Sequence, residues 1–176
     1  MKKYGLPLLL VAIVGVMIAI FAIGNNAPAK PAAALLGEKH TDLGQKHISD
    51  GEAHTAYNSE MPSSGPHYTS PAPWGAKTAE IADEILIHNA EHGGIVITYQ
   101  PTLPSDQIDK LKALAASLPK SSQFNEVKIV LAPRAKNTSP IEIMAWTYTL
   151  NLKAFDEAKI QQFYNDHLDK GPELVP

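Results

Sequence analysis

The chain has 176 residues, and its 15 basic and 18 acidic side chains give a formal net charge of −3. This balance argues against a nucleic-acid surface, which needs clustered positive charge to displace condensed counterions. The absence of cysteine excludes disulfides, thiolate metal sites, iron–sulfur clusters and haem attachment through CxxCH. The length suits one domain with an appendage.

Residues 5–24 form an apolar run of 20 residues without a charge. A helix of this length spans about 30 Å, the thickness of the hydrocarbon core of a bilayer. Lys2 and Lys3 precede the run, so the positive-inside bias places the N-terminus in the cytoplasm. We therefore expect a single-pass membrane protein whose C-terminal domain is extracytoplasmic. Cleavage of the run as a signal peptide, after the small residues 27–29, is the alternative.

The predicted organisation has three parts. Residues 1–24 comprise a cytoplasmic stub and the transmembrane anchor, residues 25–36 are a linker rich in Pro and Ala, and residues 37–176 form the globular domain. The domain begins with about forty residues, 37–76, that are rich in Gly, Pro, Ser and His and have little periodicity. A segment of this length without regular structure is typically functional.

Regular elements are expected after this segment. Apolar spacing predicts three helices, at residues 78–92, 104–118 and 156–168, with Ser105 as an N-cap. β-Branched and aromatic runs predict three strands, at residues 95–99, 127–131 and 141–150. The order is loop-α-β-α-β-β-α, with the first two strands parallel and the third antiparallel to them. We predict an α+β fold in which a small mixed β-sheet packs with helices.

Histidine is the strongest metal ligand in a chain without cysteine, and six of the seven histidines lie between residues 40 and 92. His88 and His92 are four residues apart, so they share one helix face, together with Ile85. His67 follows Gly65-Pro66, which leaves the loop little conformational freedom. His47 is a weaker fourth candidate. The alternative is that these are core or turn histidines bonded to carbonyl groups, and His167 is expected at the surface.

Two motifs resemble a known family. Ser-Gly-Pro-His-Tyr at residues 64–68 and His-Asn-Ala-Glu-His-Gly-Gly-Ile-Val-Ile-Thr-Tyr at residues 88–99 are similar to those of the bacterial domain of unknown function 3105, and residues 44–48 match a further element at His47. The resemblance covers roughly residues 44–163. It implies an N-terminal membrane span and an extracytoplasmic domain, and it singles out His47, His67, His88 and His92. It implies little about activity.

Three or four imidazoles without thiolate suit zinc or copper(II), and a nearby methionine such as Met144 would favour copper. The leading hypothesis is an extracytoplasmic domain that binds a transition metal, copper ahead of zinc, for metal binding or transfer. The expected ligands are His67, His88 and His92, with His47 or Met144 adjacent. Two alternatives stay open: a hydrolase-like metalloenzyme with Glu91 as acid or base, which the His-x-x-Glu-His pattern suggests, and an interaction module without metal. The sequence indicates no particular protein partner.

Overall fold

The computed structural model describes residues 34–176, of which Leu35–Pro176 form one compact unit. In this part of the chain, no helix is both long enough and apolar enough to cross a bilayer. The predicted anchor at residues 5–24 lies outside the described residues.

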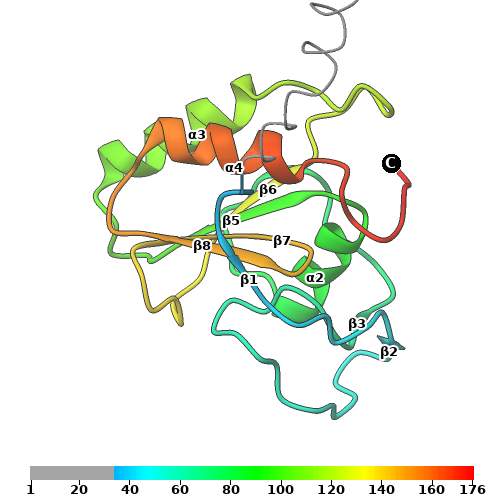
Figure 1. The fold of residues 1–176 in the computed structure, drawn as a ribbon. Coiled ribbons are helices and arrows are strands. Elements are labelled where there is room, and N and C mark those ends of the chain that lie inside the picture. Colours follow the sequence, from blue (N-terminus) through cyan, green and yellow to red (C-terminus); the bar gives the residue numbers. More distant parts are fainter. Residues whose placement is uncertain (1–33) are drawn as a thin grey trace, which may run out of the picture. The chain divides into compact units, whose positions relative to one another are not determined.

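A six-stranded mixed sheet forms the centre of the molecule, with the strand order β1-β8-β7-β5-β6-β4 (Figure 1). Its four longer strands are β5 (Ile95–Tyr99), β6 (Ile129–Pro133), β7 (Ile141–Ala145) and β8 (Tyr148–Leu152). β5 and β6 are parallel, whereas β7 runs antiparallel to both β5 and β8. Two-residue strands, β1 (Glu38–Lys39) and β4 (Gly75–Ala76), form the edges. The predicted mixed sheet packed with helices is confirmed.

Three helices cover the two faces of this sheet. α3 (Ser105–Ser117) and α4 (Glu157–His167) lie on one face, and α2 (Asp83–Glu91) lies on the other (Figure 1). The alternation of side chains along β5 explains both contacts. Ile95 and Ile97 point into the apolar cluster formed with α3 and α4, whereas Val96 points into a second cluster formed with α2. The site described below lies on the α2 side.

The structure corrects several predicted boundaries, including that of the strand expected at residues 127–131, which spans Ile129–Pro133. The predicted strand at residues 141–150 is a hairpin, β7 and β8, because the chain turns at Trp146 and Thr147, where Thr147 has φ 61°. From residue 78 onwards, the element order therefore gains one strand. α2 begins at Asp83 rather than at residue 78, and Ser105 is the first residue of α3 rather than its N-cap, which is Pro104.

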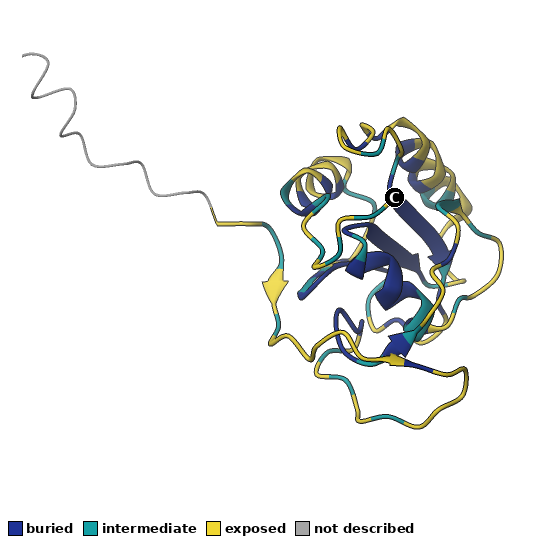
Figure 2. Ribbon diagram, turned by 90° about the vertical axis from the view of Figure 1, so that its right-hand side faces the viewer, coloured by how far each residue is buried: buried dark blue, intermediate teal, exposed yellow. Residues whose placement is uncertain are grey.

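The segment that precedes α2 is largely irregular, as predicted. It contains only two further strands, β2 (His47–Ile48) and β3 (His67–Tyr68), which pair in parallel as a separate small sheet. Figure 2 shows the central strands buried, whereas most of the chain between residues 38 and 60 is exposed. The irregular segment is therefore held at a few points, and β2 and β3 form one of them.

Candidate metal centre

The irregular segment and α2 together bring four potential ligands to one place. His47, His67, His88 and Glu91 each offer one ligand atom, and these atoms all lie within 4.8 Å of one another. The register of the β2–β3 ladder pairs His47 directly with His67. α2 supplies the other two, because residues three apart are neighbours on a helix. Strand pairing and helix spacing thus build the cluster from two distant parts of the sequence.

The loop before β3 fixes the position of His67. Gly65 has φ +116°, and a Cβ added there would lie 3.2 Å from the Leu43 Cβ and 3.3 Å from the Tyr57 ring. The Tyr57 hydroxyl donates a hydrogen bond of 2.6 Å to the carbonyl of Pro66. His67 itself is fully buried. The Gly-Pro-His sequence therefore lets this loop pack closely against Leu43 and Tyr57, and this packing fixes the position of His67.

Backbone carbonyls orient two of the imidazoles. The Nδ1 of His67 lies 2.8 Å from the Gly65 oxygen, and the Nδ1 of His88 lies 2.6 Å from the Tyr68 oxygen. A carbonyl oxygen only accepts, so each Nδ1 carries the proton and donates. The Nε2 of each ring is then the atom that can take part in the cluster. Metal-binding histidines typically have such a carbonyl partner on the other ring nitrogen.

Two of the three imidazoles contact a buried carboxylate. Glu91 is 0% exposed, and its Oε2 lies 2.9 Å from the Nε2 of His67 and 3.2 Å from the Nε2 of His47. Ligands around a tetrahedral zinc ion are separated by about 3.3–3.6 Å, given metal–ligand distances of roughly 2.0–2.2 Å. These separations are therefore close to those of a metal coordination shell.

Hydrogen bonds and ion pairs between the imidazoles and Glu91 do not by themselves account for the cluster. One carboxylate neutralises one imidazolium, and three imidazoles surround it. Burial is the main cause that lowers the pKa of the His88 imidazole, so this ring is held neutral. Glu91 Oε1 is buried and finds no hydrogen-bond partner among residues 34–176. A cation would bind the carboxylate and the imidazoles together, so this cluster could hold a metal ion.

The other predicted ligands lie beside this group or away from it. His92 is the C-cap of α2, and its Nε2 lies 3.0 Å from the Nε2 of His88, but it groups with Glu91 and Glu173 rather than with His47 and His67. Met144 is fully buried in the apolar cluster on the α2 side of the sheet. Its role as an axial ligand stays a prediction.

The remaining histidines make other contacts. His40 bonds to Thr149, and His54 bonds to Glu84. The expectation that His167 lies at the surface is wrong, because it is only 3% exposed and its Nε2 lies 2.8 Å from the carbonyl oxygen of Leu36.

Glu91 was not predicted as a ligand, although its spacing from His88 is a usable signal. Helix spacing predicted Ile85 on the inward face of the helix with the histidines. In the structure Ile85 is only half-buried, whereas Leu86 and Ile87 are almost fully buried. The C-terminal half of α2 is enclosed on most sides by the sheet and the irregular segment, so a single inward stripe does not describe it.

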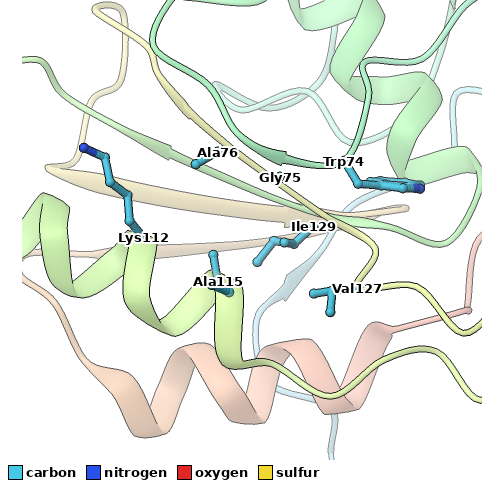
Figure 3. A pocket seen from close by; sticks show the side chains of 8 residues that line it. Trp74, Gly75, Ala76, Lys112, Ala115, Val127 and Ile129 are labelled. Atoms are coloured by element: carbon cyan, nitrogen blue, oxygen red, sulfur yellow. The ribbon is translucent and has the colours of Figure 1, made fainter.

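The molecule also has an apolar cavity of about 290 Å³ on the α3 side of the sheet (Figure 3). Trp74, β4, β6 and α3 line it, and Lys112 is its only charged residue. Its lining contains no histidine and no carboxylate, so it offers no metal ligands.

The comparisons with known proteins give a family and no described activity. No curated protein and no solved structure matches the chain significantly. The family model for "Protein of unknown function (DUF3105)" matches residues 47–175, which is more than half of the chain and includes the cluster and Glu173. The resemblance seen in the motifs is therefore confirmed, and the chain belongs to the DUF3105 family.

Proposed function

We propose that this chain is a membrane-anchored, extracytoplasmic protein that binds a transition-metal ion through His47, His67, His88 and Glu91. One observation carries the proposal: the ligand atoms of His47, His67 and His88 lie within 4.8 Å of one another and of a buried carboxylate, Glu91, one oxygen of which has no hydrogen-bond partner in residues 34–176. Such an arrangement is costly without a cation, because Glu91 Oε1 is then a buried acceptor without a hydrogen-bond partner in the described residues.

The donor set favours a divalent transition metal. Three imidazoles and one carboxylate suit zinc and copper(II), and sites of this kind bind copper(II) more tightly than zinc. We therefore keep copper ahead of zinc. The nitrogen and oxygen donors favour the divalent form of copper, since no thiolate takes part and Met144 lies in the apolar core.

The exposure of the ligands suits binding and transfer. The His47 side chain is 41% exposed, whereas the side chains of His67 and Glu91 are fully buried. An ion would enter and leave past His47, and the buried ligands would keep their positions. The alternative role of Glu91 as a catalytic acid or base has less support, because its Oε2 already lies among the ligand atoms.

Elemental analysis tests this proposal directly. The full chain, produced in medium supplemented with copper and zinc and purified in detergent, should carry bound metal. His67→Ala should lose the ion from this cluster. His40→Ala is a matched control, because His40 bonds to Thr149 and is not part of the cluster. Absence of metal from the wild-type chain, or equal metal content in both variants, would refute the proposed site.

The location has its own test. The apolar run at residues 5–24 and the two lysines before it support an anchor with the domain outside. A reporter fused after Pro176 should behave as extracytoplasmic, and the mature protein should keep residues 1–24. A mature product that begins near Lys30 would show instead that the run is a cleaved signal peptide.

A further inference from the structure

A second group of potential ligands shares Glu91 with the first. Glu91, His92 and Glu173 each offer one ligand atom, and these atoms lie within 4.8 Å of one another. The two oxygens of Glu91 have different surroundings. Oε2 faces His67 and His47, whereas Oε1 is buried without a hydrogen-bond partner in the described part of the chain. Oε1 of Glu91 therefore remains available to bind a second cation.

His92 has a similar unmet requirement. Its Nδ1 is buried and has no partner within residues 34–176, and its Nε2 lies 3.0 Å from the Nε2 of His88. Once the lone pair of His88 binds the first ion, it can no longer accept a hydrogen bond from His92. Glu173 is a further polar neighbour of His92, with its Oε2 3.7 Å from the His92 Nε2.

The C-terminal tail holds Glu173 at the end of α2. The backbone amide of Glu173 donates to the carbonyl of Glu91 at 3.0 Å, and that of Asp169 donates to the carbonyl of Gly93 at 2.9 Å. A Cβ on Gly171 would lie 2.1 Å from the Glu91 carbonyl oxygen, so the tail lies directly against the helix end. Glu173 is therefore positioned by its backbone.

The charges around this position are compatible with a cation. Buried Lys128 lies nearby and donates to the carbonyls of His92 and Val175, but its ammonium group is paired with Asp169 at 3.4 Å. The Glu173 side chain is 43% exposed, which leaves a path from solvent. Two carboxylates and one imidazole would thus face an entering ion.

We propose that the site is dinuclear: a second divalent transition-metal ion binds to Glu91, His92 and Glu173, and the Glu91 carboxylate bridges the two ions. This inference rests on the proposed function for the first ion. The second ion would use Glu91 Oε1, and it would keep open positions for water because the chain supplies three ligands. Carboxylates commonly connect paired metal ions in proteins that use two metals together.

The number of bound ions tests the proposal. The full chain in detergent is dialysed to equilibrium against Zn²⁺, and bound zinc per chain is measured by elemental analysis. The wild-type chain should bind two ions, and Glu173→Gln should bind one. Glu157→Gln should still bind two, because Glu157 is an exposed glutamate at the start of α4 and belongs to neither group.

The other outcomes separate this inference from the proposed function. One ion in both the wild-type chain and Glu173→Gln would overturn the second site and leave the first standing. Two ions in Glu173→Gln would place the second ion elsewhere and also overturn the inference. No bound zinc in the wild-type chain would overturn the zinc site at both positions.

The bridge has an independent readout with Cu²⁺. Two copper(II) ions that share a carboxylate couple magnetically, so the paramagnetic resonance signal of the doubly loaded wild-type chain should fall below that of two isolated ions. Glu173→Gln, loaded with one ion, should show the full signal of that ion. Full intensity for two bound ions in the wild-type chain would refute the bridging role of Glu91.

Discussion

Replacing Glu91 with glutamine is expected to stabilise the metal-free chain and to abolish its stabilisation by metal. Glu91 is buried, and its Oε1 has no partner in the described residues. It is also the last residue of α2, where the helix dipole disfavours a negative charge. The substitution keeps the shape of the side chain and removes the charge, and the new amide can donate to the Nε2 of His67.

The size of this effect follows from the contacts. An unsatisfied buried acceptor costs about 1–3 kcal/mol, and more when it is charged. Removal of the unfavourable charge at the helix terminus contributes roughly 0.3–1 kcal/mol. We therefore expect the free energy of unfolding of metal-free Glu91→Gln to exceed that of the wild-type chain by about 1–3 kcal/mol.

Glu142 provides a matched comparison because it is equally buried but fully bonded. Its Oε1 accepts from the Thr138 amide at 2.7 Å and the Ser139 amide at 2.9 Å, and its Oε2 accepts from Arg134 at 3.2 Å. Removing one partner of a buried ion pair typically costs about 3–5 kcal/mol. The same substitution, Glu142→Gln, should therefore have the opposite sign.

Urea denaturation of the three chains, with a chelator and with excess Zn²⁺, measures both effects. At a zinc concentration of 100 Kd for the first ion, the wild-type chain and Glu142→Gln should each gain about 2.7 kcal/mol from that ion, with any second ion adding to it, and Glu91→Gln should gain nothing. An equal loss of stability for Glu91→Gln and Glu142→Gln in chelator would contradict this expectation. That result would mean that a protonated imidazole already compensates the Glu91 carboxylate without metal.

Three further predictions concern packing, the loop and pH. Ile87→Ala should lower the free energy of unfolding in urea by about 2–5 kcal/mol, because Ile87 is 0% exposed. Ile85 is half-buried, so Ile85→Ala should lower it clearly less, and equal losses would contradict the observed burial. Gly65→Ala should weaken zinc binding in equilibrium dialysis more than Gly75→Ala. Both glycines have positive φ, but of the two only Gly65 has other atoms within 4 Å of an added Cβ. Equal affinities of the two variants would show that the loop tolerates the change. Burial lowers the pKa of His167, so the unfolded chain takes up this proton first and its contribution to stability is lost as pH falls below about 6.5. Metal-free His167→Gln should therefore lose stability less steeply with falling pH than the wild-type chain, and parallel curves would contradict this.

Local sequence patterns predicted those helices and strands whose boundaries depend on neighbouring residues in the chain. The strand at residues 95–99 was placed correctly because a β-branched run directly follows two glycines. The β7–β8 hairpin was missed because its turn contains Thr147 in a left-handed conformation rather than the usual Gly or Asn. The start of α2 depends on tertiary contacts, since Asp83 at its first position pairs with Arg134, fifty-one residues away in the sequence.

In the candidate site, too, local patterns identified some of the ligands, and tertiary contacts determine the others. The loop motif identified His67, and helix spacing identified His88, which both lie in the cluster. Glu91 was missed because a helix enclosed on most sides has no single inward stripe. Glu173 could not be predicted as a neighbour of Glu91, because the contact depends on how the C-terminal tail returns to the end of α2.

The short ladder between β2 and β3 determines where extra residues can be inserted into the chain. Doubling the length of a flexible loop costs only about 0.6 kcal/mol in closure entropy, and residues 49–56 are almost entirely exposed. A shift of one residue in the pairing of His47 with His67 would instead turn one imidazole to the opposite face. Insertions, including a peptide tag or a recognition sequence for a partner, should therefore be accepted at residues 49–56, whereas a single added residue between Gly65 and His67 should dismantle the cluster.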